Sequence, residues 1–288
     1  MILNSYAKLN LYLAVLDKRQ DDYHNLDTLF ERISLADRIT LKPRRDREIK
    51  ITTNCSCIPR DDTNLAWRAA RLLQGSFNLK QGIDIKIQKR IPIGSGMGGG
   101  SSNAAFVLTG LNQLWKLGLS QKSLVGLAKK IGSDVPFFIY DCAFAQGSLR
   151  GDKIRPLRQF AGIKLWHIVV MPKIKVSTPL IYKKWDEYSK LTKPASGVRI
   201  LLSALRKRDF YLIGKSLFNS LEQITAGLYP EVRRIKEVLL GKGLQSILMS
   251  GSGPAVFGIL PSRKEAVSLS KQLSTKHRSW QFFVTHTI

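Results

Sequence analysis

Residues 92–102 form the segment that most constrains the fold of this chain. Five glycines (94, 96, 98, 99 and 100) and three serines (95, 101 and 102) separate an alternating run over 83–87 from a helical pattern over 104–115. Period-two alternation is typical of a half-buried strand, so the loop joins a strand to a helix. Glycine allows positive φ and close ligand approach, and a helix N-terminus presents free N–H groups. The segment therefore predicts a cradle for an anion such as a phosphate.

The surroundings of this loop exclude several known phosphate-binding motifs. Gly94-x-Gly96-x-x-Gly99 matches the dinucleotide fingerprint, but that fingerprint needs an acidic residue ~20 positions downstream. No acidic residue follows the loop before Asp134. The chain has no Gly-x-x-x-x-Gly-Lys-Ser/Thr, which excludes a Walker loop. It also lacks the His-Arg-Asp and Asp-Phe-Gly elements of protein kinases.

The net charge of +25, from 46 basic and 21 acidic residues, predicts attraction to polyanions. Residues 1–162 hold 25 basic and 14 acidic residues (+11), and residues 163–288 hold 21 and 7 (+14). The excess therefore belongs to the whole body and not to a tail. Nucleic acid, phosphorylated metabolites and an anionic membrane surface all remain open on charge alone.

Three cysteines do not make a disulfide framework in a chain of 288 residues. Cys55-x-Cys57 has no partner pair at the spacing of a zinc site. The N-terminus shows no signal peptide, and no apolar run approaches the ~20 residues that span a bilayer. We therefore expect a reduced, cytoplasmic protein without a membrane partner.

The order of the predicted elements indicates an α+β protein with a boundary near residues 159–162. A strand is predicted over 9–16, and residues 39–41 and 49–51 flank a charged stretch, as in a hairpin or at a sheet edge. Asp61, Asp62 or Thr63 would cap a helix over 64–73. The second half combines strands near 165–171, 246–249, 255–260 and 281–285 with helices between them, without strict alternation. We expect domains at 1–162 and 163–288.

The segment from Pro92 to Ala105 resembles the phosphate loop of the GHMP kinases, a superfamily that includes galactokinase, homoserine kinase and mevalonate kinase. The whole chain is most similar to the branch that phosphorylates the 2-hydroxyl of 4-diphosphocytidyl-2-C-methyl-D-erythritol in the non-mevalonate isoprenoid pathway. The matching segments span almost the full length. They are Ala-Lys-Leu-Asn-Leu-Tyr-Leu at 7–13, Asp-Tyr-His at 22–24, Leu-Phe at 29–30, the loop at 92–105, Ile-Gly-Ser-Asp-Val-Pro-Phe-Phe at 131–138 and Met-Ser-Gly-Ser-Gly-Pro-Ala-Val-Phe at 249–257.

This resemblance implies a role for each matching residue. It makes Lys8 and Asp134 the catalytic pair. It places the cytidine end of the substrate against Asn10, Tyr23, His24, Thr178 and Tyr182. It places ATP along Pro92, Ile93, Gly94, Ser95, Gly96, Met97, Gly98, Gly99, Gly100, Ser101 and Ser102, with Asn64 and Leu65 at the adenosine.

The chemistry of these residue types agrees with the implied roles. A carboxylate such as Asp134 can take the proton of an attacking hydroxyl, and a nearby Lys8 would stabilise the transferring charge. A flat cytosine ring suits a sandwich between Tyr23 and Tyr182, with His24 at its polar edge. Taken alone, Lys8 is typical of the solvent face of a strand, Asp134 of a helix cap, and the aromatic residues of packing.

The resemblance also implies a fold, cofactors and partners. The fold is a two-domain GHMP kinase fold, ribosomal-protein-S5-domain-2-like in the N-terminal domain and a ferredoxin-like α/β sandwich in the C-terminal domain. The cofactors are ATP and Mg²⁺, for which no protein ligand is implied. The partners are small molecules, with no specific nucleic acid, in a monomer or homodimer.

Two departures and two rival functions complete the expectations. Asp22 stands where the branch often has glycine, and Asn103 where many members have aspartate. The first rival is a GHMP kinase for a mevalonate- or homoserine-like alcohol, which would have no use for the aromatic residues. The second is a basic nucleic-acid-binding protein, although the chain lacks any basic run interleaved with aromatics.

Overall fold

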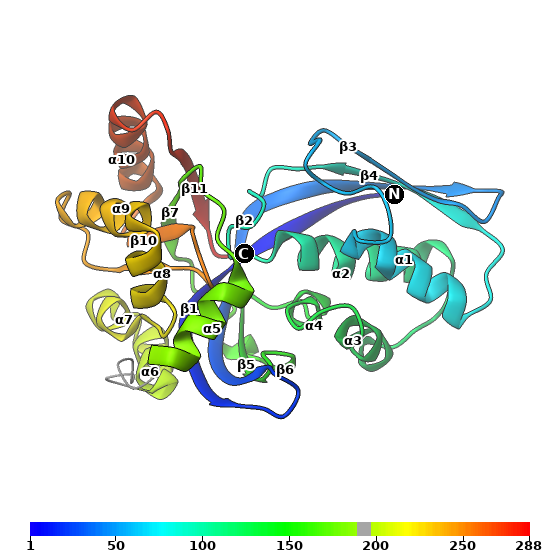
Figure 1. The fold of residues 1–288 in the computed structure, drawn as a ribbon, viewed down its shortest axis with the longest axis horizontal. Coiled ribbons are helices and arrows are strands. Elements are labelled where there is room, and N and C mark those ends of the chain that lie inside the picture. The colour runs from blue at the N-terminus through cyan, green and yellow to red at the C-terminus, as the bar shows by residue number, and fades with distance from the viewer. Residues whose placement is uncertain (189–196) are drawn as a thin grey trace.

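The computed structural model describes residues 1–188 and 197–288 and shows two lobes, each built on its own sheet (Figure 1). The strands are β1 (Ile2–Lys18), β2 (His24–Arg44), β3 (Ile49–Thr53), β4 (Gly82–Gln88), β5 (Phe144–Leu149), β6 (Lys153–Pro156), β7 (Trp166–Met171), β8 (Phe218–Asn219), β9 (Ile247–Met249), β10 (Val256–Leu260) and β11 (Gln281–His286). The helices are α1 (Leu65–Ser76), α2 (Gly99–Leu114), α3 (Gln121–Lys129), α4 (Val135–Ile139), α5 (Thr178–Tyr188), α6 (Val198–Lys207), α7 (Phe210–Ser216), α8 (Glu222–Leu228), α9 (Pro230–Leu240) and α10 (Arg263–Lys276), with a 3₁₀ turn at Arg158–Phe160.

The larger sheet has the order β3-β4-β2-β1-β8, and β5 and β6 extend it beside β2. The antiparallel pair β1–β2 is long enough to run from this lobe to beneath the smaller one (Figure 1). Helices α1 to α4 lie on one side of the sheet (Figure 1). Isoleucines on alternate positions of β4 pack against buried positions of α1 and α2. This packing accounts for the period-two pattern at 83–87, because only one side chain in two faces the helices.

The smaller sheet is antiparallel and has the order β11-β7-β10-β9. Helices α5 to α9, with the short strand β8 among them, lie between β7 and β9 in the chain. Helix α10 connects β10 to β11. A βαββαβ path with this strand order is the ferredoxin-like arrangement, so the expected fold of the second half is confirmed. Leu9 and Leu29 of the larger sheet share one buried cluster with Val169 and Phe257 of the smaller sheet. The two lobes are therefore joined by apolar packing.

The structure corrects several sequence expectations about local elements. Strand β4 lies between β2 and β3, so the hairpin interpretation of residues 39–51 is wrong and the sheet-edge interpretation is correct. The cap of α1 is Asn64, whose side chain accepts from the N–H of Ala66, and not Asp61, Asp62 or Thr63. Elements β5, β6, β8, α4, α7 and α8 were not anticipated.

The short strand β8 belongs to the second half of the chain but joins the sheet of the first half. It comes from residues 218–219 and pairs in parallel with β1 of the larger sheet. The division of the chain at residues 162 and 163 stays a prediction. Over the described ranges 1–188 and 197–288, no helix is both long and apolar enough to cross a membrane.

Candidate active site

Two cavities meet at the glycine-rich loop. The first has a volume of about 470 Å³ and lies between the lobes, and the second, of about 380 Å³, lies beside α1 and α2. Gly94, Gly96 and Gly98 line both cavities. The first also contains Lys8, Asn10, Tyr23, His24, Asp134, Thr178 and Tyr182. The second also contains Asn64, Leu65, Pro92, Ile93, Ser95, Gly99, Gly100 and Ser101.

Two glycines give the loop a shape that other residues would not allow. Gly96 has a φ of +75°, and a Cβ there would lie 2.1 Å from the backbone oxygen of Ser250. The Ser250 hydroxyl donates to the Gly96 carbonyl at 3.2 Å, so the Ser-Gly-Ser-Gly segment is in direct contact with the loop. Gly98 has a φ of +67° and is the N-cap residue of α2, where it has no side chain that could accept from the helix N–H groups. The first N–H groups of α2 are thus free to bind an anion at the cavity wall.

Two predicted loop residues do not present their side chains to either cavity. Met97 is fully buried in the core between the lobes, and its carbonyl accepts from the N–H of Lys8 at 3.0 Å. Ser102 is also fully buried, and its hydroxyl donates to the carbonyl of Tyr6 at 2.6 Å. Both residues hold the loop against β1 and do not face a ligand.

Lys8 lies on β1 with its ammonium group in the first cavity and is only 4% exposed. Its Nζ lies 3.6 Å from Oδ2 of Asp134 and donates to Oδ1 of Asn10 at 2.5 Å. Asn10 is two residues along β1, on the same side of the strand, and its Nδ2 donates to the hydroxyl of Thr28 at 2.8 Å. These contacts compensate the burial of the lysine charge and fix its position. The solvent-facing alternative for Lys8 is therefore wrong.

Asp134 occupies the N-cap position of α4, but its side chain makes no cap hydrogen bond. The helix-cap alternative therefore does not describe this residue. Its side chain is 34% exposed and lies beside Lys8. A carboxylate that is open to the cavity and adjacent to a cation can accept a proton from a bound hydroxyl.

The far end of the first cavity is built from aromatic rings. His24 stacks on Tyr182, with ring centroids 5.2 Å apart and planes at 26°. Burial, and secondarily the charge of Asp134, raise the pKa of the Tyr182 hydroxyl well above its usual value. The ring therefore stays neutral at physiological pH.

Asp186 on α5 holds His24 in place. Nε2 of His24 donates to Oδ1 of Asp186 at 2.6 Å, and Nζ of Lys18 lies 3.1 Å from Oδ2. Partial burial acts to raise the pKa of the Asp186 carboxyl, but the hydrogen bonds from His24 and Lys18 outweigh it and lower the pKa. Because an ionised carboxylate only accepts, Nε2 carries the proton and Nδ1 of a neutral His24 is an acceptor.

Tyr23 is 54% exposed, and the guanidinium of Arg150 lies 5.1 Å from its ring centroid. Arg150 lines the cavity, as do Ser133 and Ser252. Sequence reasoning missed Arg150 because it lies between β5 and β6, two strands that were not anticipated. The Ser252 hydroxyl is hydrogen bonded to that of Thr178 at 2.7 Å, and the Ser-Gly-Ser-Gly motif was the signal for it.

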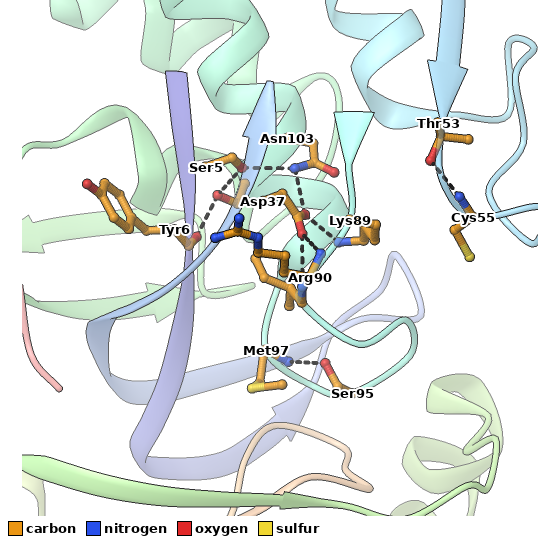
Figure 2. Close-up of polar contacts among 12 residues, drawn as sticks. Ser5, Tyr6, Asp37, Thr53, Cys55, Lys89, Arg90, Ser95, Met97 and Asn103 are labelled. Atoms are coloured by element: carbon orange, nitrogen blue, oxygen red, sulfur yellow. Dashed lines mark hydrogen bonds and ion pairs between the residues drawn. The ribbon is translucent and has the colours of Figure 1, made fainter. Parts of the chain in front are cut away.

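A buried carboxylate binds residues at the wall of the second cavity. Asp37 on β2 is fully buried and lies 2.5 Å from Nζ of Lys89, which lines the cavity (Figure 2). It also accepts from the N–H groups of Arg90 and Ile91 at 2.7 and 2.9 Å. Asn103 donates to the same carboxylate at 2.9 Å. An aspartate at position 103 could not donate there, which gives the amide a structural purpose.

Comparisons with known proteins agree with this architecture. The GHMP kinases N terminal domain matches residues 64–142, and the GHMP kinases C terminal domain matches residues 201–278. The 4-diphosphocytidyl-2-C-methyl-D-erythritol kinase of Alkaliphilus metalliredigens is 39% identical over 278 residues, covering 96% of this chain and 93% of that protein. This chain belongs to the 4-diphosphocytidyl-2-C-methyl-D-erythritol kinase family of GHMP kinases. The family member from Geobacillus sp. strain WCH70 is 44% identical over 90% of this chain and 88% of its own length.

A comparison with solved structures also finds a member of this family. A crystal structure of 4-(cytidine 5'-diphospho)-2C-methyl-D-erythritol kinase matches all of both chains with a TM-score of 0.84 and 32% identity. Homoserine kinase from Cytophaga hutchinsonii matches 98% of this chain and 93% of its own with a TM-score of 0.72. At 20% identity, the latter shows a shared fold alone.

Membership of the GHMP kinases implies ATP as the phosphoryl donor. Among the residues that the structure describes, no cluster of three or more His, Cys, Asp or Glu side chains could hold a metal ion. Asp134 is the carboxylate that pairs with Lys8, and one carboxylate is too few for a resident metal site. Mg²⁺ commonly keeps several waters and binds through substrate phosphates with one or two carboxylates. The donor set therefore fits a metal that enters with ATP.

Proposed function

We propose that this protein transfers the γ-phosphoryl group of ATP to the 2-hydroxyl of 4-diphosphocytidyl-2-C-methyl-D-erythritol. The observation that carries the proposal is the meeting of two cavities at Gly94, Gly96 and Gly98. One cavity has the family's adenosine positions, and the other has the Lys8–Asp134 pair. Such a junction lets donor and acceptor approach in line, which is the main requirement of phosphoryl transfer.

The nucleotide would lie in the second cavity with its phosphates at the start of α2. Asn64 and Leu65 would contact the adenosine, and the N–H groups of Gly99, Gly100 and Ser101 would face the phosphates. Asn64 also caps α1, so its amide oxygen is already engaged and its role toward adenosine is positional. Mg²⁺ bound to the phosphates would neutralise charge on the transferring group.

Asp134 would take the proton as the 2-hydroxyl oxygen attacks the γ-phosphorus. The bond from the γ-phosphorus to the β–γ bridging oxygen breaks, and ADP leaves. Lys8, whose ammonium lies 3.6 Å from Asp134, would stabilise the charge on the transferring phosphoryl group. The hydrogen bond from Lys8 to Asn10 holds the ammonium at the junction of the cavities.

The cytidine end of the acceptor would lie at the aromatic end of the first cavity. His24 covers part of Tyr182, so the base would contact Tyr182 and Tyr23 from the cavity side. Nδ1 of His24 matches the exocyclic amino group of cytosine, which donates. Arg150 would face the diphosphate, an anion that suits a guanidinium. A mevalonate- or homoserine-like alcohol would leave this half of the cavity empty.

A substrate panel tests the proposed activity. Purified protein with ATP and Mg²⁺ should phosphorylate the cytidine substrate and give little product with mevalonate or homoserine. Preference for either small alcohol would overturn the acceptor assignment.

Variants of the catalytic pair test the assigned roles. Asp134→Asn and Lys8→Met should each lower kcat by about 10²–10⁴-fold, because each removes a group that acts in the transition state. The matched control is Asp62→Asn, since Asp62 is exposed and lies outside both cavities. If folded Asp134→Asn and Lys8→Met enzymes keep near-native turnover, the catalytic roles are wrong.

A further inference from the structure

Cys55 and Cys57 lie in a turn after β3, at the edge of the second cavity. Cys57 is exposed and lines the cavity, and Cys55 is partly exposed. The N–H of Ile58 donates to the carbonyl of Cys55 at 3.3 Å, which closes the turn. The two cysteines are thus the first and third residues of one tight turn. The phosphoryl-transfer chemistry uses neither of them.

The two thiols differ in the way that a reactive pair does. The Cys57 thiol lowers the pKa of Cys55 through a hydrogen bond, and the charge of Lys89 contributes in the same direction. The same hydrogen bond raises the pKa of Cys57. Because the thiolate is the nucleophile, Cys55 is suited to attack and Cys57 to resolve. The third cysteine, Cys142, is buried, and burial raises its pKa.

The turn is connected to the strand that leads into the glycine-rich loop. The N–H of Lys89 donates to Oδ1 of Asn54 at 2.7 Å, and Nδ2 of Asn54 donates to the carbonyl of Lys89 at 3.4 Å. Asn54 directly precedes Cys55, whose own N–H donates to the hydroxyl of Thr53 at 3.2 Å (Figure 2). A change in the backbone of the turn would therefore reach Lys89 and the cavity wall.

We propose that Cys55 and Cys57 form a reversible disulfide that weakens nucleotide binding in the second cavity. A disulfide across one intervening residue closes a small ring, so the turn must change its backbone to accommodate it. Strained, exposed disulfides are readily reduced again, which makes the modification reversible. The effect on nucleotide affinity rests on the proposed ATP site, whereas the formation of the disulfide does not.

The oxidant is a low-molecular-weight disulfide such as oxidised glutathione. The Cys55 thiolate attacks one of its sulfurs, the glutathione S–S bond breaks, and one glutathione thiolate leaves. Cys57 then loses its proton to solvent and attacks the Cys55 sulfur of the mixed disulfide, releasing the second glutathione thiolate. The cysteine pair loses two electrons, which reduce the oxidised glutathione to two thiols.

The test combines mass spectrometry with nucleotide binding by calorimetry. Reduced protein is incubated with oxidised glutathione, and its intact mass, its cysteine-containing peptides and its Kd for a non-hydrolysable ATP analogue are measured. We expect the loss of two hydrogens, a peptide linked between Cys55 and Cys57, and binding about tenfold weaker, or ~1.4 kcal/mol. Dithiothreitol should restore both the mass and the Kd.

Three variants separate the steps. Cys55→Ser should not react, Cys57→Ser should retain one glutathione as a mixed disulfide, and Cys142→Ala should behave as the unmodified protein does. Absence of the linked peptide would overturn the proposal. A disulfide that forms but leaves the Kd unchanged would overturn the proposed effect of the disulfide on nucleotide binding. Failure of the reduced protein to bind the analogue would instead overturn the proposed ATP site.

Discussion

The carboxylate of Asp37 is fully buried, yet each of its oxygens accepts at least two hydrogen bonds or ion-pair contacts. Replacing it in Asp37→Asn leaves the ammonium of Lys89 without an anion. We expect a loss of about 3 kcal/mol in the free energy of unfolding, because an uncompensated buried charge is strongly destabilising. Urea denaturation measures this loss, and Asp62→Asn on the exposed surface is the matched control.

The double variant Asp37→Asn/Lys89→Met checks independently whether the unpaired ammonium of Lys89 causes this loss of stability. Removing both members of a buried pair costs less than removing one. The double variant should therefore be more stable than Asp37→Asn alone. A double variant that is less stable than the single one would contradict the view that the unpaired lysine causes the loss.

At the scale of the element, the glycine-rich loop depends on its contact with the Ser-Gly-Ser-Gly segment. In Gly96→Ala, the new methyl group would overlap the backbone oxygen of Ser250 in a left-handed conformation. We expect a loss of at least ~2 kcal/mol in stability, with weaker nucleotide binding in the folded fraction. Thermal unfolding and calorimetry with an ATP analogue measure the two effects.

Gly126→Ala is the matched control, because Gly126 lies in helix α3 with open space around it. Alanine in an exposed helix position should add roughly 0.5–1 kcal/mol of stability and leave turnover unchanged. Equal effects of the two substitutions would contradict the special role of Gly96.

At the scale of the whole molecule, Asp186 of the smaller lobe links to His24 and Lys18 at the end of the β1–β2 pair. Its pKa is lowered in the folded state, so its contribution to stability is present above the unfolded value of ~3.9. That contribution is lost as pH falls through the folded pKa. Asp186→Asn should thus be less stable at pH 7, and the gap to the unmodified protein should narrow below about pH 4.

Urea denaturation across this pH range measures the gap, and Asp62→Asn should show none. The same variant should raise the KM of the cytidine substrate, because His24 loses the partner that orients it, with kcat less affected. A stability gap that stays constant down to acid pH would contradict the ionic origin of this link.

The sequence alone predicted the features that depend on neighbouring residues. The strand before the loop occurs where expected, since alternation acts locally, whereas the helix after the loop begins at Gly99, within the segment expected to be loop. The resemblance located the seven predicted catalytic and substrate residues of the first cavity, but it gave no role to Thr28 or Arg150, which also line it. The α+β class and the two GHMP folds are confirmed. The cytoplasmic location and the exact domain boundary stay predictions.

Only the tertiary structure decided which distant residues meet. Lys8 and Asp134, His24 and Asp186, and Gly96 and Ser250 are pairs separated by more than a hundred positions in the chain. Local periodicity does not encode strand order, so the insertion of β4 between β2 and β3 was invisible to it. Short or mixed strands such as β5, β6 and β8 carry too few alternating residues to be recognised. β8 pairs with β1 and β5 with β2, so both form along the long β1–β2 ladder, and β6 pairs in turn with β5.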